Sequence, residues 1–354
     1  MQEINLIGGV NKLSYGRVTI NLLIQLRKLG VKVNLLPIGN LEFESKEKED
    51  IYWGLENSKT TETTVPSVKV WHAHNCSFPE VLTGPHYQMP IFELDTFTEQ
   101  EKSELSKVQI INCTKWAEEV CHKNGLTNTV GIVNLGYDPG IFYPKERPKN
   151  ELFTVLNVGK WEIRKGHDII PEIFSLAFSP EDPVSLVMCC HNPFYTQEET
   201  DSWINYYNKK LQNYNISFVG RLDTQEQLAN LMRQTDCGLF PARAEGWNLD
   251  LLEMLACNIP CVYSDYSGHS EFTTHGIKLN KKELAIDGKW FFGQGIWGEI
   301  TSDNIKSFAH QLKEIYWLWL DNKYDSGQDV SSFTWEHSSK QLLEILNGNS
   351  NFST

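Results

Sequence analysis

The chain of 354 residues lacks several features that would place it in other protein classes. No apolar run reaches the roughly 20 residues that a membrane-spanning helix needs, and no signal-peptide pattern opens the sequence. The eight cysteines form no Cys-x-x-Cys pair, and their apolar neighbours predict small buried core residues in a reducing compartment rather than zinc ligands. No internal repeat or low-complexity tract is present. We therefore expect a soluble, cytoplasmic globular protein.

Basic residues are scarce as well. The chain holds 32 Lys and Arg against 45 Asp and Glu, for a net charge of −13. Residues 1–150 carry a net charge of −2 and the remainder −11. Because an acidic surface repels phosphate polymers and anionic lipids, this balance disfavours non-specific binding of nucleic acids or membranes. Any anionic partner is expected to dock on the nearly neutral N-terminal part.

Short apolar runs alternate with amphipathic helical patterns along the whole chain, which predicts parallel strands joined by crossover helices. In the first part we expect strands at 4–7, 31–36, 68–72 and 109–112, and helices at 18–29 and 116–123. In the second part we expect strands at 153–158, 184–190, 216–219, 237–241 and 260–264, and helices at 168–177, 200–212, 224–233, 249–257, 303–320 and 335–347.

The charged, proline-bearing segment 144–150 is typical of a linker between domains. We therefore predict an N-terminal domain over 1–148 and a second domain over 149–325. The remaining segment, 326–354, contains the last amphipathic helix. With this length, each domain is able to bury a core of its own.

Residues 241–271 are the most informative stretch of the sequence. Glu245 and Glu253 stand eight positions apart, and the apolar run between them predicts a buried helix beginning near Leu249. Unpaired backbone N–H groups and the positive helix end there would suit a phosphate or a polar sugar edge. Eight residues span a little over two turns, so both carboxylates are expected on roughly the same face. One could bind a sugar and the other a ribose, although two acids at this spacing alone also suit a surface Glu before a core helix.

The two acids, followed by Ala256-Cys257-Asn258 and a Gly-x-x-Glu loop at 268–271, resemble the EX7E signature of retaining glycosyltransferases of family 4. Two positions depart from that pattern: Trp247-Asn248 replaces an aromatic-Gly pair, and Asn258 replaces a Gly. The resemblance implies the α/β GT-B fold, with two Rossmann-like domains facing across a cleft and a C-terminal helix crossing back to the first domain. It also implies that the first domain binds the acceptor and the second the donor.

Lys160 and Lys165 form the second constellation. A strand ending in Gly159 delivers both cations into the loop before a helix, where they could stabilise a departing pyrophosphate. The segment resembles the family's Gly-Arg-x-x-x-x-Lys-Gly, with Lys160 in place of Arg, which keeps the charge but loses the bidentate fork. A solvated basic turn is the alternative, and Arg164 is assigned to the surface.

Two further candidates lie in the first domain. The loop within 7–19 fails the GxGxxG spacing, but family members have a comparable glycine loop, so Gly16 is expected at the helix start near the donor's phosphates, while Gly8 and Gly9 serve as a turn. His72 and His74 alternate on the strand that we predict over 68–72, so they should point to opposite sides. Similar enzymes place a histidine here near the donor sugar, which assigns that role to His74; a core histidine is the alternative.

The resemblance implies a retaining transferase that moves a hexose-type sugar from a UDP- or GDP-sugar to an acceptor hydroxyl. Glu245 would bind the sugar and stabilise an oxocarbenium-like transition state, and Glu253 would bind the ribose. The lysines and the amides of Gly246, Trp247, Asn248 and Leu249 would hold the pyrophosphate and sugar.

No convincing DxD triad is present, so we expect neither a metal nor another cofactor. A GT-B sugar-nucleotide epimerase or hydrolase and a degenerate, non-catalytic GT-B binding protein stay open as alternatives. The acceptor could be a glycan, a small molecule or a modified nucleic-acid base, because a locally basic site would offset the acidic charge.

Overall fold

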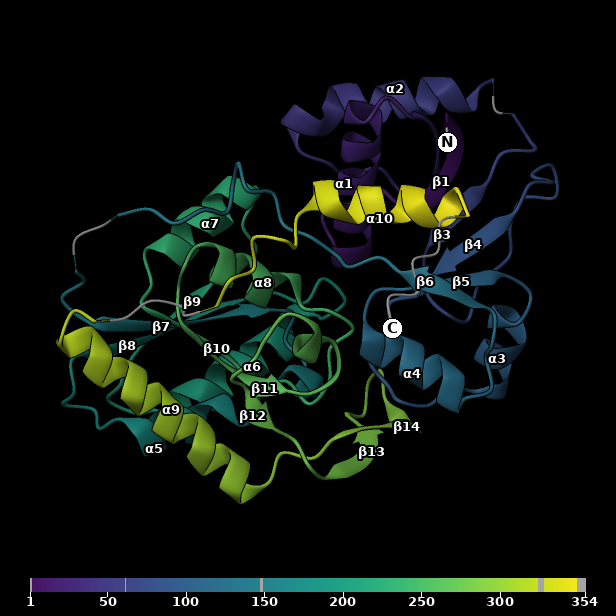
Figure 1. The fold of residues 1–354 in the computed structure, drawn as a ribbon. Helices are drawn as coiled ribbons and strands as arrows, with labels where there is room; N and C mark the ends of the chain where they lie inside the picture. Colours follow the sequence, from purple (N-terminus) through teal and green to yellow (C-terminus); the bar gives the residue numbers. More distant parts are fainter. Residues whose placement is uncertain (1, 61, 147–148, 324–327, 349–354) are drawn as a thin grey trace. The chain divides into compact units, whose positions relative to one another are not determined.

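The chain forms two compact units in the computed structural model, which describes residues 2–60, 62–146, 149–323 and 328–348 (Figure 1). Unit 1 comprises residues 1–136 with 332–354, and unit 2 comprises residues 137–331. The predicted linker, 144–150, contains residues 147 and 148, which lie outside the described residues. The assignment of acceptor and donor roles to the two parts of the chain stays a prediction.

Unit 1 is built on a parallel six-stranded sheet in the order β2-β1-β3-β4-β5-β6. The chain passes from β1 to β2 on one side and then returns to β3 on the other side, so the topological switch point lies between β1 and β3. The strands are β1 (Glu3–Gly9), β2 (Lys32–Ile38), β3 (Ser67–Val70), β4 (His86–Met89), β5 (Gln109–Asn112) and β6 (Thr129–Ile132).

The last helix belongs to unit 1, although the chain reaches it only after completing unit 2. It packs against α1 through an apolar face that buries Trp335, Leu342 and Leu346. Thr334 caps its first turn by accepting a hydrogen bond from the backbone of His337. The helical elements of unit 1 are α1 (Ser14–Lys28), η1 (Ser45–Glu47), α2 (Lys48–Ser58), α3 (Glu99–Leu105), α4 (Lys115–Lys123) and α10 (Trp335–Leu346).

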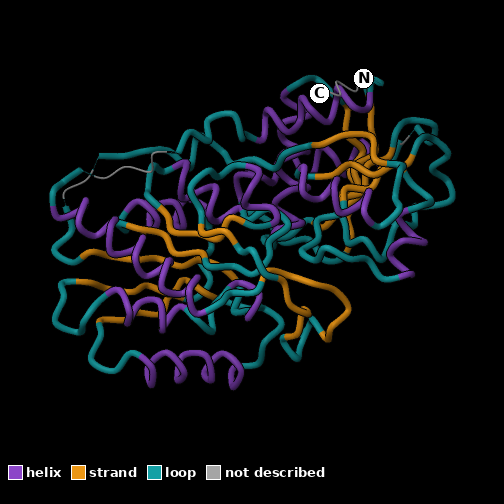
Figure 2. Tube along the Cα trace, turned by 60° about the horizontal axis from the view of Figure 1, so that its bottom comes forward, coloured by secondary structure: helices purple, strands orange, loops and turns teal. Residues whose placement is uncertain are grey.

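Unit 2 repeats this plan with a parallel sheet in the order β12-β11-β10-β7-β8-β9, and helices cover both of its faces (Figure 2). Its switch point lies between β7 and β10. The strands are β7 (Phe153–Gly159), β8 (Val184–Cys190), β9 (Asn215–Val219), β10 (Cys237–Phe240), β11 (Cys261–Asp265) and β12 (Ile277–Lys278). The helical elements are η2 (Ile163–Lys165), α5 (Ile170–Ala177), α6 (Gln197–Lys210), α7 (Gln225–Arg233), α8 (Leu249–Ala256), η3 (Ser267–Glu271) and α9 (Ser302–Leu320).

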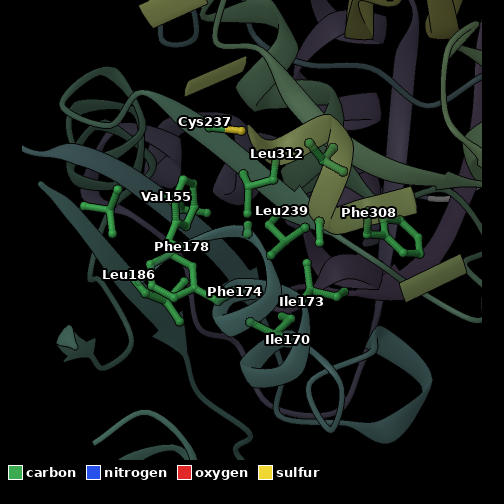
Figure 3. Packing of buried hydrophobic residues seen from close by; sticks show 14 of the residues in the cluster. Val155, Ile170, Ile173, Phe174, Phe178, Leu186, Cys237, Leu239, Phe308 and Leu312 are labelled. Carbon is green, nitrogen blue, oxygen red and sulfur yellow. The ribbon is translucent and has the colours of Figure 1, made fainter. Parts of the chain in front are cut away.

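The core of unit 2 lies between this sheet and the helices α5 and α9 (Figure 3). Val155 and Leu239 come from neighbouring strands, Phe174 comes from α5, and Phe308 and Leu312 come from α9. All five are fully buried, and burying a side chain of this size contributes about 1.5–3 kcal/mol. This core fixes β7 and β10, the strands whose following loops carry the polar candidate residues.

An antiparallel hairpin, β13 (Lys282–Ile286) and β14 (Phe292–Gly298), forms a separate two-stranded sheet in unit 2. This hairpin was not predicted from the sequence, and neither were β4, α3, β6 and β12. Within the described residues, no helix combines the length and apolarity that a bilayer span requires. The eight cysteines are free, and seven of them are buried, as predicted.

Two local predictions were wrong. Gly8 and Gly9 lie inside β1 instead of forming a turn. A Cβ at Gly8 would stand 2.3 Å from Oγ1 of Thr19, so glycine here lets α1 pack closely on the strand. The strand predicted over 68–72 ends at Val70, which places the following histidines in a loop.

Gly166 generates a stability prediction for unit 2. Its φ is +77°, and a Cβ there would lie 2.1 Å from the carbonyl oxygen of Pro241. We expect Gly166→Ala to lower the free energy of unfolding by roughly 2 kcal/mol or more, through left-handed strain and displacement of the backbone. Gly220→Ala is the control, because a Cβ at Gly220 meets no atom within 4 Å. Urea unfolding would contradict this account if both variants lost the same stability.

Candidate active site

The loops after β7 and β10 meet at the switch point of unit 2. Nζ of Lys165, in the first loop, lies 2.6 Å from Oε1 of Glu245, in the second. Gly159, at the end of β7, has a φ of +151°, and a Cβ there would approach Cδ of Lys165 to 3.0 Å. The lysine side chain therefore lies across the glycine backbone, which explains why this position suits glycine.

A second cation holds the other oxygen of Glu245. Nη1 of Arg164 lies 2.9 Å from Oε2 of Glu245 and donates a hydrogen bond to the carbonyl of Ala244 at 2.7 Å. Its Nη2 pairs with Oε2 of Glu162 at 2.7 Å. Arg164 is only 4% exposed, so its assignment to the surface was wrong. The guanidinium is buried because its fork matches two carboxylates and a carbonyl at once.

Lys160 completes the network from the solvent side. Its Nζ lies 2.9 Å from Oε1 of Glu162, and its side chain is 36% exposed. Three cations and two carboxylates thus alternate, in the order Lys160, Glu162, Arg164, Glu245 and Lys165. Glu162 and Arg164 were not predicted as members of the site. The sequence offers one signal for them, the alternating charges of Lys-Trp-Glu-Ile-Arg-Lys at 160–165, but this pattern is equally typical of a solvated turn.

The network fixes the protonation of its members. Burial alone would raise the pKa of Glu245, but Arg164 and Lys165 outweigh it and hold that pKa well below its usual range. The pKa of Glu162 is lowered in the same way, by Arg164 and Lys160 against burial. Burial would lower the pKa of Lys165, yet Glu245 raises it above the ordinary value. Both acids are therefore ionised at neutral pH, and the lysine is protonated.

The backbone around Glu245 is held by the segment after β11. The backbone N–H of Glu245 donates to Oγ of Ser267 at 2.8 Å, and the N–H of Gly268 donates to the Glu245 carbonyl at 2.8 Å. A Cβ at Gly268 would lie 2.5 Å from the backbone of Gly246, so the two loops touch through glycine. Trp247 is buried against Phe272, with ring centroids 5.0 Å apart.

Asn248 stands where the EX7E pattern usually has a glycine. Its φ is +78°, in the left-handed region that Asn tolerates better than other side chains. As the N-cap of α8, its side chain accepts from the N–H of Leu251 and donates to Nε2 of His269 at 2.9 Å. Nδ1 of His269 donates to the carbonyl of Ser264 at 2.8 Å, which fixes the tautomer of the neutral ring.

The remaining donor-binding candidates of unit 2 lie in α8. Leu249 is the first residue of the helix, and Glu253 stands one turn further along. Glu253 is fully buried, whereas Lys165 and Glu245 keep small exposed fractions. A ligand would reach the Glu253 carboxylate only after a neighbouring side chain or loop moved.

Gly16 and His74 belong to unit 1. A Cβ at Gly16 would lie 2.0 Å from the carbonyl oxygen of Asn11, so the loop before α1 packs directly on this glycine. The prediction that His72 and His74 point to opposite sides of a strand was wrong. Their rings stack with centroids 5.3 Å apart and an interplanar angle of 16°, because the strand ends at Val70 and the loop turns both side chains the same way.

Across the part of the chain that the structure describes, no group of three or more His, Cys, Asp or Glu side chains could hold a metal ion.

Residues 142–291 match the family "Glycosyl transferases group 1". This segment contains all five members of the charge network. A GDP-mannose-dependent alpha-(1-6)-phosphatidylinositol dimannoside mannosyltransferase of Mycobacterium tuberculosis is 26% identical over 173 residues. The match covers 47% of this chain and 43% of the relative, so it spans less than half of that protein's length.

Solved structures resemble the chain over almost its full length. A glycosyltransferase from Rickettsia africae has a TM-score of 0.69 at 12% identity, covering 99% of each chain. HepE from Anabaena, in complex with UDP-glucose, has a TM-score of 0.66 at 13% identity, covering 98% of this chain and 100% of that one. At these identities the likeness concerns the fold, and the predicted GT-B fold of two Rossmann-like domains is confirmed.

Buried histidines generate a pH prediction. Burial lowers the pKa of His269 to about 4 and that of His167 to about 3, from the ordinary histidine value of 6.5. Below pH 6.5 the two histidines bind protons in the unfolded chain but stay neutral in the folded one. The free energy of unfolding therefore has its full histidine contribution above pH 6.5 and decreases as the pH falls toward 4. For His269→Gln, the loss of unfolding free energy between pH 6.5 and pH 4 should be smaller by about 1 kcal/mol or more than for the unmodified protein.

Urea unfolding between pH 4 and 7 measures the slope for each variant. His310→Gln, at an exposed position, should keep the slope of the unmodified protein. Parallel curves for His269→Gln and the unmodified protein would contradict the assignment.

Proposed function

We propose that the protein is a retaining glycosyltransferase that moves a hexose-type sugar from a UDP- or GDP-sugar to an acceptor hydroxyl. The observation that carries this proposal is the Glu245 carboxylate held between Arg164 and Lys165 at the switch point of unit 2. This geometry lies within the segment that matches the group 1 family. Ligands of open α/β sheets bind at the carboxyl ends of the strands beside such a switch point.

In this proposal the donor diphosphate replaces Glu245 as the ion-pair partner of Lys165 and Glu162 as that of Lys160. Both ammonium groups are reachable, because Lys160 is 36% exposed and Lys165 is 12% exposed, whereas Arg164 is only 4% exposed. Arg164 also keeps its bonds to Glu162 and Ala244 when Lys165 leaves. Arg164 is thus the fixed cation that holds Glu245 in place, and Lys165 is the cation that changes partner.

The chemistry follows from where charge develops. The departing phosphate gains negative charge, which the lysines and the amides of Gly246–Leu249 at the start of α8 stabilise. The anomeric carbon gains positive charge, which the ionised Glu245 carboxylate stabilises. Retention follows if the acceptor attacks from the face that the phosphate leaves, with that phosphate accepting the acceptor's proton. No divalent cation is needed in this scheme.

The other candidates keep supporting roles. Gly159 gives Lys165 room to lie across the backbone, and Trp247 and Asn248 fix the loop that carries Glu245. Glu253 binds the ribose diol once the neighbouring groups that bury it move. The donor-binding roles of Gly16 and His74, which belong to unit 1, stay predictions from the resemblance.

The test is a panel of UDP- and GDP-hexoses, chosen because the mannosyltransferase relative is named for GDP-mannose and HepE was solved with UDP-glucose. Incubation with and without EDTA, followed by NMR of the products, reports donor consumption, metal dependence and anomeric configuration. Transfer with retention in EDTA is expected. Release of free or rearranged sugar without an acceptor would instead indicate a hydrolase or an epimerase, and no binding of any donor would contradict the proposal.

Lys165→Ala should lower kcat/KM for the donor at least tenfold, which corresponds to about 1.4 kcal/mol of lost transition-state stabilisation. The reason is the loss of the cation that faces the departing diphosphate. Lys210→Ala, on the exposed end of α6, is the control and should leave kcat/KM unchanged. Full activity of Lys165→Ala in steady-state assays would contradict the electrostatic scheme.

Glu253→Gln should weaken binding of the nucleotide sugar and of the bare nucleoside diphosphate to the same extent, since both ligands carry the ribose. Calorimetry with each ligand measures the two affinities. Glu172→Gln, an exposed carboxylate of α5, serves as the control. An unchanged affinity of Glu253→Gln for the bare nucleotide would rule out the ribose role.

A further inference from the structure

The β13–β14 hairpin, which forms a sheet of its own in unit 2, presents apolar side chains to solvent (Figure 1). Leu284, Ile286 and Phe292 are 59%, 56% and 70% exposed, and Trp290, in the turn, is 40% exposed. These are four of the fourteen large apolar side chains that are exposed within the described residues. Because exposed apolar residues are normally scattered singly over a surface, a cluster of this kind indicates a site of association.

The register of the two strands places these side chains on one face. Ile286 lies opposite Phe292 in the antiparallel pair, and Leu284 precedes Ile286 by two residues, so all three are on the same side. We call this side the outer face. The other side carries Ala285 and Trp297, which are buried. Antiparallel sheets with one buried face normally have polar residues on the other, and this hairpin departs from that pattern.

The hairpin is held in place by its own acidic residues. Oε1 of Glu283, in β13, accepts from Nε1 of Trp297 at 3.0 Å and pairs with Nε of Arg243 at 3.2 Å. In the turn, Oδ1 of Asp287 accepts from the N–H of Trp290 at 2.7 Å and from two neighbouring backbone N–H groups. The outer face is therefore a fixed feature of unit 2, and both acids of the hairpin are engaged by groups of the protein.

Lysines lie beside the apolar side chains. From the end of β12 to the end of β14, residues 278–298 contain four Lys against two acidic residues, in a chain whose net charge is −13. Lys278, Lys281 and Lys282 are exposed at the base of the hairpin, and the fourth lysine, in the turn, pairs with Glu199. The net charge of the whole chain disfavours binding to anionic surfaces, but this segment is a local exception.

We propose that the outer face of the β13–β14 hairpin docks unit 2 on an anionic lipid surface. The apolar side chains enter the boundary between headgroups and acyl chains, a depth at which Trp is also favoured. Four residues of extended strand, roughly 14 Å, separate Lys282 from Ile286, so the lysines at the base reach the lipid phosphates when the turn is inserted. This inference goes beyond the proposed function and does not depend on it.

A second copy of the chain is the other partner that an apolar face could take, and the lysines disfavour it. In a two-fold interface the same patch meets itself, so the exposed lysines of both copies would come together and repel each other. An anionic lipid surface offers an apolar layer and the opposite charge at once. Charge complementarity therefore favours the lipid, and self-association is an outcome that the test must be able to detect.

The test is co-sedimentation with vesicles of phosphatidylcholine alone and of phosphatidylcholine with about one third phosphatidylglycerol. Ile286→Gln, Phe292→Gln and the corresponding double variant remove the apolar contact. Leu176→Gln is the matched control, because Leu176, in α5, is 56% exposed, as Ile286 is. Near-UV circular dichroism first establishes that each variant is folded.

A second pair of variants tests the charge. Lys281→Gln combined with Lys282→Gln removes two cations at the base of the hairpin, and Lys209→Gln combined with Lys210→Gln, at the exposed end of α6, is the control. These substitutions leave the apolar side chains unchanged. The charge variants therefore keep the proposal testable if an apolar substitution disturbs folding.

The unmodified protein should bind the anionic vesicles and bind the neutral ones more weakly. The double apolar variant and the double lysine variant of the hairpin should each bind anionic vesicles about tenfold more weakly or less, while both controls keep the affinity of the unmodified protein. Three results would overturn the proposal: no binding of the unmodified protein, equal binding to neutral and anionic vesicles, or equal binding by hairpin variants and controls. Light scattering after size exclusion adds a fourth, because a dimer that the double apolar variant dissociates would assign the outer face to a second copy.

Discussion

The pairing of Glu245 with Arg164 and Lys165 is the interaction on which the rest of the site depends. A carboxylate that is 5% exposed would be costly to keep ionised alone, by several kcal/mol, so both cations must be delivered to it by the fold. The parallel sheet does this by ending β7 and β10 side by side. Gly159 and Gly166 then allow the loop after β7 to turn so that Lys165 reaches the acid. The Glu245 carboxylate therefore both holds the two loops together and is the candidate group for the chemistry.

The cations of the network differ in how easily an anionic ligand could replace their carboxylate partners. Arg164 is enclosed by acceptors from Glu162, Ala244 and Glu245, whereas Lys165 and Lys160 each have one carboxylate partner and some exposure. An anionic ligand would therefore displace carboxylates from the lysines first. In the proposed function, Arg164 keeps Glu245 in place while Lys160 and Lys165 bind the donor.

The sequence predicted those parts of the site that depend on chain order. Apolar runs located β7, β8 and β10, and the spacing of Lys165, Glu245 and the start of α8 followed from the motifs. Long-range pairing was not predictable in the same way. Arg164 has the local pattern of a surface cation, but it is buried because Ala244 and Glu245, about eighty residues further along the chain, supply acceptors for its guanidinium. Asn248 departs from the motif in residue type, and its backbone lies in the left-handed region that glycine adopts readily.

The errors have physical causes of the same kind. Alternation placed His72 and His74 on opposite faces, but a strand persists only where a neighbour pairs with it, and β3 pairs with β1 and β4 only as far as Val70. Gly8 and Gly9 have the local pattern of a turn, whereas the packing of α1 keeps them in β1. The β13–β14 hairpin was missed although its turn signal, Asp287-Gly288, is present in the sequence: Gly288 has a φ of +74°, and Oδ1 of Asp287 accepts from three backbone N–H groups of the turn.

The most direct test of the central claim is the affinity of Glu245→Gln for a bare nucleoside diphosphate, measured by calorimetry beside the unmodified protein. Near-UV circular dichroism would first establish that the variant is folded, as expected because Arg164 keeps Glu162 as a partner. If Lys165 exchanges between Glu245 and the diphosphate, removing the competing charge should leave the affinity equal or higher while sugar transfer is lost. An affinity at least tenfold lower, about 1.4 kcal/mol, would show instead that the Lys165–Glu245 pair is a fixed structural element.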